Sequence, residues 1–165
     1  MSAQTTLLED FTHDNSLHWR IINDSVMGGI SSSKMELLPE GIGKFSGKVS
    51  LENNGGFAST RGTLTASPKF AHTNVLLKIK GDGKKYSFRI LTNLDRVSYK
   101  QDFTTAKGTW QKIELSLADF TPTWRGQQLI NIPPINATQI QQIGFLISDK
   151  QEGLFELLVD WIQLE

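Results

Sequence analysis

Apolar and polar residues alternate along much of this chain, which is the spacing of β-strands that bury one face. The alternation is clear in residues 45–51, 75–80, 86–90, 113–117 and 155–161. Residues 143–147 are nearly all apolar, as is typical of a central strand covered on both faces. Helical spacing is scarce, and only single turns are predicted, at residues 117–120 and 137–142.

Polar and glycine-containing segments separate the predicted strands. Residues 39–41 (Pro-Glu-Gly) and 81–83 (Gly-Asp-Gly) are each predicted to join two strands, and residues 93–95 to form a third turn. Residues 121–134 have the composition of a long ordered loop. Short strands between such turns predict an all-β fold, an antiparallel β-sandwich or jelly roll, with residues 1–165 as one domain.

Composition narrows the classes of function. The 165 residues include 17 basic and 17 acidic side chains, so we expect neither nucleic acid nor a strongly electrostatic membrane anchor as partner. The absence of cysteine excludes thiol catalysis, disulfides and thiolate zinc sites. The first 15 residues lack a secretory pattern, and no apolar run approaches a membrane span. We therefore expect a cytoplasmic protein without direct membrane insertion.

Catalytic patterns are weak in this chain. The three histidines lack metal-ligand spacing, no Gly-x-Ser-x-Gly elbow occurs, and the carboxylates are scattered. We therefore expect no enzyme and no catalytic residues. Of the four tryptophans, Trp110 and Trp161 lie in strand patterns and are predicted to pack, whereas Trp124 is the best candidate for an exposed, sugar-stacking ring.

Two glycine-rich segments stand out as candidate binding loops. In residues 23–33, Asp24 is followed by two glycines and three serines. This composition suits a polar pocket, but an ordinary turn into a strand, with Gly28 and Gly29 at positive φ, is favoured on local chemistry.

The second segment, residues 52–62, places Phe57, Ser59 and Arg61 on one face of a regular strand. If Phe57 points inward, Arg61 does too and needs a partner, for which Asp24 is a candidate. The alternative is that Arg61 lies at the strand end and reaches water. The pattern leaves both alternatives open.

These segments resemble the CIA30 family, the complex I intermediate-associated proteins of about 30 kDa. The similarity is carried by Trp19 and by residues 23–31, 45–47 and 51–61, followed in order by residues 81–86, 99–103, 120–126, 143–145 and 153–155. It extends roughly from Leu8 to Ile162. The resemblance implies a galactose-binding-like jelly roll and a non-enzymatic role, since eukaryotic members act as chaperones in assembling the membrane arm of respiratory complex I.

The resemblance also strengthens the case that the polar residues Asp24, Asn54 and Arg61 have a specific role, because they lie in the best-matched segments. They are expected either to form one internal network that joins two loops, which is favoured, or to line a groove for a ligand or client. Trp124 and Arg125 are further candidates for binding.

Carbohydrate-binding modules of the same fold often carry a structural Ca²⁺ between their first and last strands. By this analogy Glu9 and Asp160 are candidate oxygen donors. The favoured alternative is two surface carboxylates on edge strands, because Ca²⁺ needs six or more oxygens. No other cofactor is expected.

The leading hypothesis is thus a non-catalytic, chaperone-like assembly factor that binds a protein client. The client would be a subunit of a membrane-bound respiratory or photosynthetic complex, such as NADH dehydrogenase (complex I). The alternative is a carbohydrate-binding module, with Trp124, Arg125 and the region of Asp24 and Arg61 at its groove. An exposed apolar patch would favour the client, and aligned aromatic faces would favour the sugar.

Overall fold

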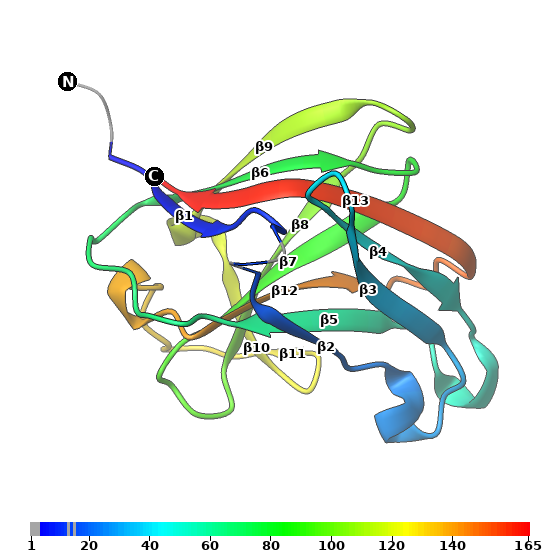
Figure 1. Cartoon of the computed structure of the whole chain (residues 1–165). Coiled ribbons are helices and arrows are strands. Elements are labelled where there is room, and N and C mark those ends of the chain that lie inside the picture. The colour runs from blue at the N-terminus through cyan, green and yellow to red at the C-terminus, as the bar shows by residue number, and fades with distance from the viewer. Residues whose placement is uncertain (1–3, 13, 15) are drawn as a thin grey trace.

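Two antiparallel β-sheets pack face to face in the computed structural model (Figure 1). The structure describes residues 4–12, 14 and 16–165, with the backbone alone at positions 26, 27 and 54. The six-stranded sheet has the order β3 (Ser32–Leu38), β4 (Ile42–Val49), β13 (Gly153–Leu164), β6 (Asn74–Lys80) and β9 (Trp110–Ser116), and β1 (Thr6–Glu9) also pairs with β13. The seven-stranded sheet has the order β11 (Gln127–Gln128), β10 (Thr121–Trp124), β8 (Ser98–Thr104), β7 (Lys85–Leu91), β12 (Gln142–Ile147), β5 (Ala58–Thr63) and β2 (His18–Ile21). The predicted antiparallel sandwich is therefore confirmed.

The core lies between the sheets and is built from the apolar positions of the alternating strands. Phe88 and Phe145 meet edge to face with ring centroids 5.3 Å apart, and Phe45 and Phe155 do so at 5.0 Å. All four side chains are buried. Burial of these rings and of the aliphatic residues around them is the main favourable term that holds the sheets together.

The same alternation defines the opposite side of the seven-stranded sheet. In β7, Tyr86, Phe88 and Ile90 are buried in the core, so the intervening Ser87 and Arg89 face away from the six-stranded sheet. We call this side the outer face. The register of the neighbouring strands extends the outer face from β2 to β10.

The connections agree in part with the predicted turns. Residues 39–41 join β3 to β4, and single 3₁₀ turns form at η3 (Leu117–Asp119) and η4 (Ala137–Gln139). Residues 81–83 join β6 to β7, but these strands belong to different sheets, so the segment crosses the sandwich. No helix in the described part of the chain is long and apolar enough to span a membrane.

The prediction of a loop over residues 121–134 is wrong for its first part. Residues 121–128 form the β10–β11 hairpin, in which Thr121 pairs with Lys100 and Thr123 with Ser98 of β8. Pro122 breaks the local strand signal in the sequence, but the two-residue strand β11 pairs only with Thr123 and Trp124, so Pro122 lies beyond that pairing and has a strand neighbour on the β8 side alone.

Glu9, at the end of β1, is buried between the sheets. Its carboxylate accepts five hydrogen bonds, from the amides of Asp10, Phe11 and Leu17, the hydroxyl of Ser16 and the indole nitrogen of Trp19, the last at 2.6 Å. A buried carboxylate is costly unless its lone pairs are satisfied. Here they are satisfied by donors, so Glu9 fixes the path of the chain between β1 and β2.

We predict that Glu9→Gln lowers the free energy of unfolding by about 1–3 kcal/mol, because the amide presents N–H groups to backbone N–H donors. The measurement is chemical denaturation at neutral pH. Glu114→Gln, at an exposed position of β9, is the matched control and should leave stability unchanged. Equal stabilities of the two variants would contradict this role of Glu9.

Candidate functional site

Asp24, the first residue of η1 (Asp24–Met27), joins the two glycine-rich loops. Its carboxylate accepts hydrogen bonds from the Ser31 amide at 3.0 Å, the Gly56 amide at 2.8 Å and the Phe57 amide at 3.4 Å, and the Ser31 hydroxyl also donates to it. The side chain is fully buried. Around Asp24, one carboxylate therefore replaces water for four donors, which belong to Ser31, Gly56 and Phe57.

Two glycines make room for this carboxylate. A Cβ at Gly29 would lie 2.4 Å from Asp24 Cγ, and one at Gly55 would lie 2.5 Å from Oδ2. Gly28 has φ 87°, as expected for a turn, but Gly29 is required for close approach and not for a positive φ. The glycines of both loops thus serve the same buried acid.

The hydrogen bonds also decide the charge of Asp24. Burial alone raises the pKa of a carboxyl group, but the bonds from the Ser31 hydroxyl and the amides of Gly56, Ser31 and Phe57 outweigh it and hold the pKa of Asp24 below its usual value. Asp24 is therefore ionised at neutral pH. A buried anion whose lone pairs are engaged by fixed donors acts as a structural clamp.

Asn23 extends the clamp toward β5, although it was not among the candidate residues of its segment. Its side-chain oxygen accepts from the Ser33 hydroxyl at 2.8 Å and from the Ser59 amide at 3.2 Å. The Ser59 hydroxyl donates to the carbonyl oxygen of Ile22. Together Asn23 and Asp24 tie the chain after β2 to β3 and to the start of β5.

Arg61 does not pair with Asp24, so that part of the predicted network is wrong. Phe145 of the core pairs with Thr60, and Arg61 therefore lies on the outer face of β5, opposite Arg20 of β2. Arg61 follows Phe57, a contact of Asp24, by four residues, or roughly 13 Å of extended strand. The side chain of Asn54 lies outside the described part of the structure.

Trp124 and Arg125 lie at the β10–β11 turn, away from the Asp24 loops. Trp124 is 41% exposed, and the guanidinium carbons of Arg125 and Arg96 lie 4.8 and 5.9 Å from the centre of its ring. The cations occupy positions around the ring that a stacked sugar would need. The five candidate binding residues are thus distributed over separate places in the fold.

Three exposed apolar side chains lie around the loops that Asp24 joins. Ile30 precedes Ser31 and is 54% exposed, Leu51 follows Ser50 and is 37% exposed, and Leu154 of β13 is 76% exposed. The Ser31 hydroxyl contacts Ser50, and the Leu51 amide donates to Glu152, which brings the three segments to the same end of the sandwich. We call Ile30, Leu51 and Leu154 the loop patch.

Glu9 and Asp160 do not fit the calcium site that the analogy indicated. The oxygens of Glu9 already accept from N–H and O–H donors, and these would oppose a cation. Asp160 pairs instead with Lys78 at 3.4 Å. Nor is Glu9 the surface carboxylate of the alternative, because it is buried.

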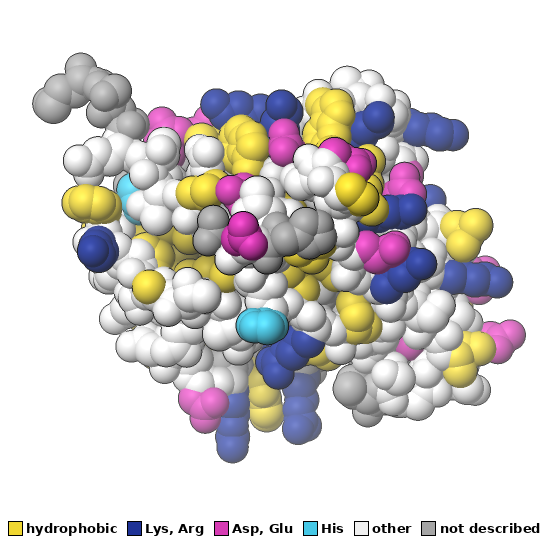
Figure 2. Space-filling view, viewed as in Figure 1, with side chains coloured by type: hydrophobic (Ala, Val, Ile, Leu, Met, Phe, Trp, Pro, Cys, Tyr) yellow, Lys and Arg dark blue, Asp and Glu magenta, His cyan; other side chains and the backbone are white. Residues whose placement is uncertain are grey.

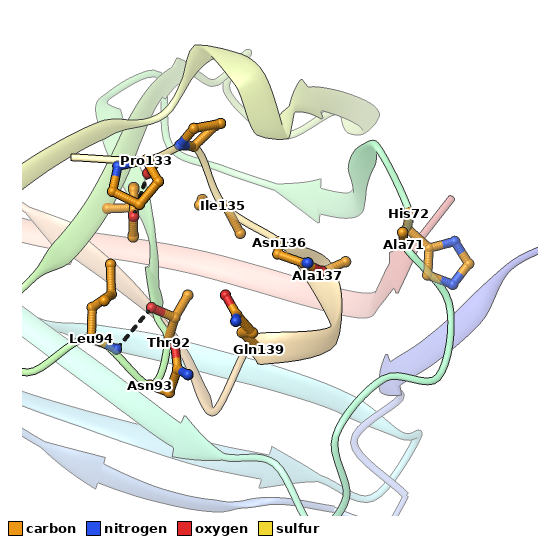
Figure 3. Close-up of a pocket in the computed structure, with 12 residues that line it drawn as sticks. Ala71, His72, Thr92, Asn93, Leu94, Pro133, Ile135, Asn136, Ala137 and Gln139 are labelled. Atoms are coloured by element: carbon orange, nitrogen blue, oxygen red, sulfur yellow. Dashed lines mark hydrogen bonds between the residues drawn. The ribbon is translucent and has the colours of Figure 1, made fainter. Parts of the chain in front are cut away.

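A hollow of about 640 Å³ opens between the η4 segment and the loops before β6 and after β7 (Figure 3). Ala71, His72, Asn93, Ile135 and Asn136 contribute to its wall. The Tyr99 hydroxyl donates to the carbonyl of Pro133 at its edge. No residue of the predicted site lines this hollow.

We predict that Asp24→Asn destabilises the fold by about 1–3 kcal/mol at neutral pH, because an amide cannot accept from all four donors. Since folding lowers the pKa of Asp24, its contribution is present above the reference value of 3.8 and is lost as pH falls through the folded pKa. The difference in free energy of unfolding between wild type and variant should therefore be constant from about pH 5 to about pH 8 and should narrow below about pH 4.

Denaturation curves measured across this range test the prediction, with the exposed Asp119→Asn as control. A gap that is absent at neutral pH would contradict the clamp, and a gap that widens in acid would contradict the sign of the pKa shift.

Solved structures of carbohydrate-binding modules have the same fold. A family 11 module from Clostridium thermocellum, in complex with a β-1,3-1,4-mixed-linked tetrasaccharide, matches with a TM-score of 0.73 and 18% identity over 99% of this chain and 96% of that one. An agarase matches with a TM-score of 0.65 and 11% identity over 98% of this chain and 24% of that one. At such identities the likeness establishes the fold alone.

A curated relative and a family model connect the chain to one family. The mouse protein "Complex I intermediate-associated protein 30, mitochondrial" is 27% identical over 92 residues, which are 52% of this chain and 28% of the mouse protein. The family model described as Complex I intermediate-associated protein 30 (CIA30) matches residues 9–159, which include the clamp at Asp24, both loops and the outer face. The chain belongs to the CIA30 family.

Proposed function

We propose that this domain is a non-catalytic, chaperone-like assembly factor that binds a protein client. The client is a subunit of a membrane-bound electron-transfer complex such as NADH dehydrogenase. Membership of the CIA30 family supports this role. The structural observation that supports it is the exposed loop patch.

The loop patch has the properties of a contact surface for protein. Exposed aliphatic side chains gain free energy when a partner removes them from water. Asp24 accepts four hydrogen bonds, two from Ser31, which follows Ile30, and two from Gly56 and Phe57 in the loop that follows Leu51, so the loops are ordered before a client arrives. Preorganisation of this kind lowers the entropy lost on binding.

The aromatic arrangement gives little support to the alternative, a carbohydrate-binding module. The residues that the register assigns to the outer face between β2 and β10 include no Phe, Tyr or Trp. Trp110 belongs to the other sheet, where Lys78 and Lys80 each lie 5.9 Å from its ring centre. We therefore propose protein in preference to sugar as the ligand. The cytoplasmic location expected from the sequence stays a prediction.

The test is affinity purification of the tagged full chain from its native cell at endogenous level, with quantification of NADH dehydrogenase subunits. A variant carrying Ile30→Ser, Leu51→Ser and Leu154→Ser should recover at least about tenfold less of them, since central apolar contacts commonly contribute 2 kcal/mol or more. Leu7→Ser with Ile130→Ser, at exposed positions outside the loop patch, is the matched control and should recover the wild-type amount.

Melting temperatures of both variants establish that each remains folded. If the wild-type protein recovers no electron-transfer subunit but binds a mixed-linked tetrasaccharide, the proposal is wrong and the carbohydrate alternative takes its place. Equal recovery by the patch variant and the control would contradict the assignment of the loop patch.

A further inference from the structure

Four basic residues form a row across the outer face of the seven-stranded sheet. Arg20 of β2 pairs with Arg61 of β5, Gly144 of β12 lies between Arg61 and Arg89 of β7, and Arg89 pairs with Lys100 of β8. Strands in a sheet are about 4.8 Å apart, so the row spans roughly 19 Å. We call Arg20, Arg61, Arg89 and Lys100 the basic row. In the view of Figure 2, Lys and Arg side chains are interspersed with Asp and Glu over the surface, and some project from the lower edge, near the strands labelled β2, β10 and β11 in Figure 1.

The arginines of this row lack counter-charges. Among the described residues none of the three forms an ion pair, and only Lys100 has a carboxylate nearby, Asp102 at 3.8 Å. Arg89 Nε donates to the Ser98 hydroxyl at 2.9 Å. Arg61 Nε is buried and has no partner among the residues described. Like charges directly opposite one another on neighbouring strands destabilise a sheet.

Burial and a neighbouring positive charge both disfavour the charged forms of Arg61 and Arg89. Burial and then the charge of Arg20 lower the pKa of Arg61, and burial and then the charge of Arg61 lower the pKa of Arg89 to about 10. Both side chains still carry their charge at neutral pH. The free protein therefore holds closely spaced, partly desolvated cations that an anion would stabilise.

Gly144 determines how close these cations lie. A Cβ at this position would be 2.3 Å from the backbone oxygen of Thr60 and 3.2 Å from Arg61 Cγ, so the glycine lets β5 and the Arg61 side chain lie against the bare backbone of β12. A larger residue would displace the Thr60 backbone as well as the Arg61 side chain. The glycine thus keeps Arg61 low on the outer face, between Arg20 and Arg89.

An unpartnered acceptor lies beside the basic row. Gln142, two residues before Gly144 on the same face, has a buried side-chain oxygen with no hydrogen-bond donor among the described residues. A ligand that completes this face therefore brings oxyanions for the arginines and an N–H or O–H donor for Gln142. A peptide with acidic side chains has both, whereas a nucleic-acid backbone has no donor on its phosphates. The zero net charge of the chain also disfavours nucleic acid.

We propose that the outer face binds an extended acidic segment of the client protein, laid across the strands along the basic row. At about 3.3 Å per residue, a span of roughly 19 Å corresponds to about six residues. Alternate carboxylates of such a segment face the arginines, and its backbone N–H groups face Gln142. This inference rests on the proposed function, because it identifies the chemistry of the protein client.

The test uses a fluorescently labelled hexaglutamate peptide and the full chain, with binding followed by anisotropy. We expect binding that weakens as salt is raised, and about tenfold or greater loss of affinity in Arg61→Gln and in Arg89→Gln, since each removes a charge-assisted hydrogen-bond donor. Lys112→Gln, at an exposed position of the six-stranded sheet, is the matched control and should bind as wild type.

Stability separates a binding role from a structural one. Because the cations repel each other in the free protein, Arg61→Gln should melt at the wild-type temperature or above it. A variant that melts lower and keeps its affinity for hexaglutamate would overturn the inference. So would wild-type protein that binds hexaglutamine equally well, or that binds oligogalacturonate or a single-stranded oligonucleotide but not hexaglutamate.

The purification described above distinguishes failure of this inference from failure of the proposed function. Wild-type protein that recovers NADH dehydrogenase subunits but does not bind hexaglutamate overturns the acidic segment and leaves the assembly role intact. Hexaglutamate binding that depends on Arg61 and Arg89, without recovery of those subunits, supports the basic row as an acidic-peptide site and overturns the named client.

Discussion

The conformation of the loops depends on one requirement, that a carboxylate taken out of water must find a donor for each lone pair. Asp24 meets it by drawing four donors from two loops that lie more than twenty residues apart in the chain. Glu9 meets it with five donors between β1 and β2. Among the residues that the structure describes, neither acid has a cation beside it, and the hydrogen-bond partners of both are dipoles fixed by the fold. The loops consequently keep one shape, and Ile30 and Leu51 stay in place without a core of their own.

The sequence predicted most of the sheet framework because alternation is a local property. In β6, β7, β9 and β13 the apolar residues at alternate positions, such as Tyr86, Phe88 and Ile90 of β7, face the core of the sandwich whichever strand lies beside them, so the period of two suffices. The prediction was poorer for the short strands at or next to the edges of the seven-stranded sheet. Strands β2 and β10 have four residues each, and they are strands chiefly because a neighbour supplies hydrogen-bond partners.

Candidate sites were harder to predict, because they depend on which strands are neighbours. Parity correctly placed Ser59 and Arg61 together, but it did not say which face they share, and Phe57 lies before β5 begins. The basic row joins residues 20, 61, 89 and 100, whose proximity follows from the strand order β8-β7-β12-β5-β2. No local pattern in the sequence encodes that order of strands. The role of Asp24 was visible in outline, since an acid among glycines and serines indicates a polar network, but its donors on the second loop were not.

The loop patch and the basic row suit each other as parts of one binding surface. Phe57, whose amide donates to Asp24, and Arg61 lie on the same stretch of chain, four residues apart, so the backbone that Asp24 holds is within roughly 13 Å of Arg61 in the basic row. Apolar contacts at the loops supply affinity, whereas closely spaced cations favour an acidic partner and disfavour basic ones. Two modest contacts that one chain can make together bind more tightly than either does alone, because the second forms at high effective concentration. The proposed assembly role would benefit from this division, because loss of either contact weakens the binding of the client and so favours its release.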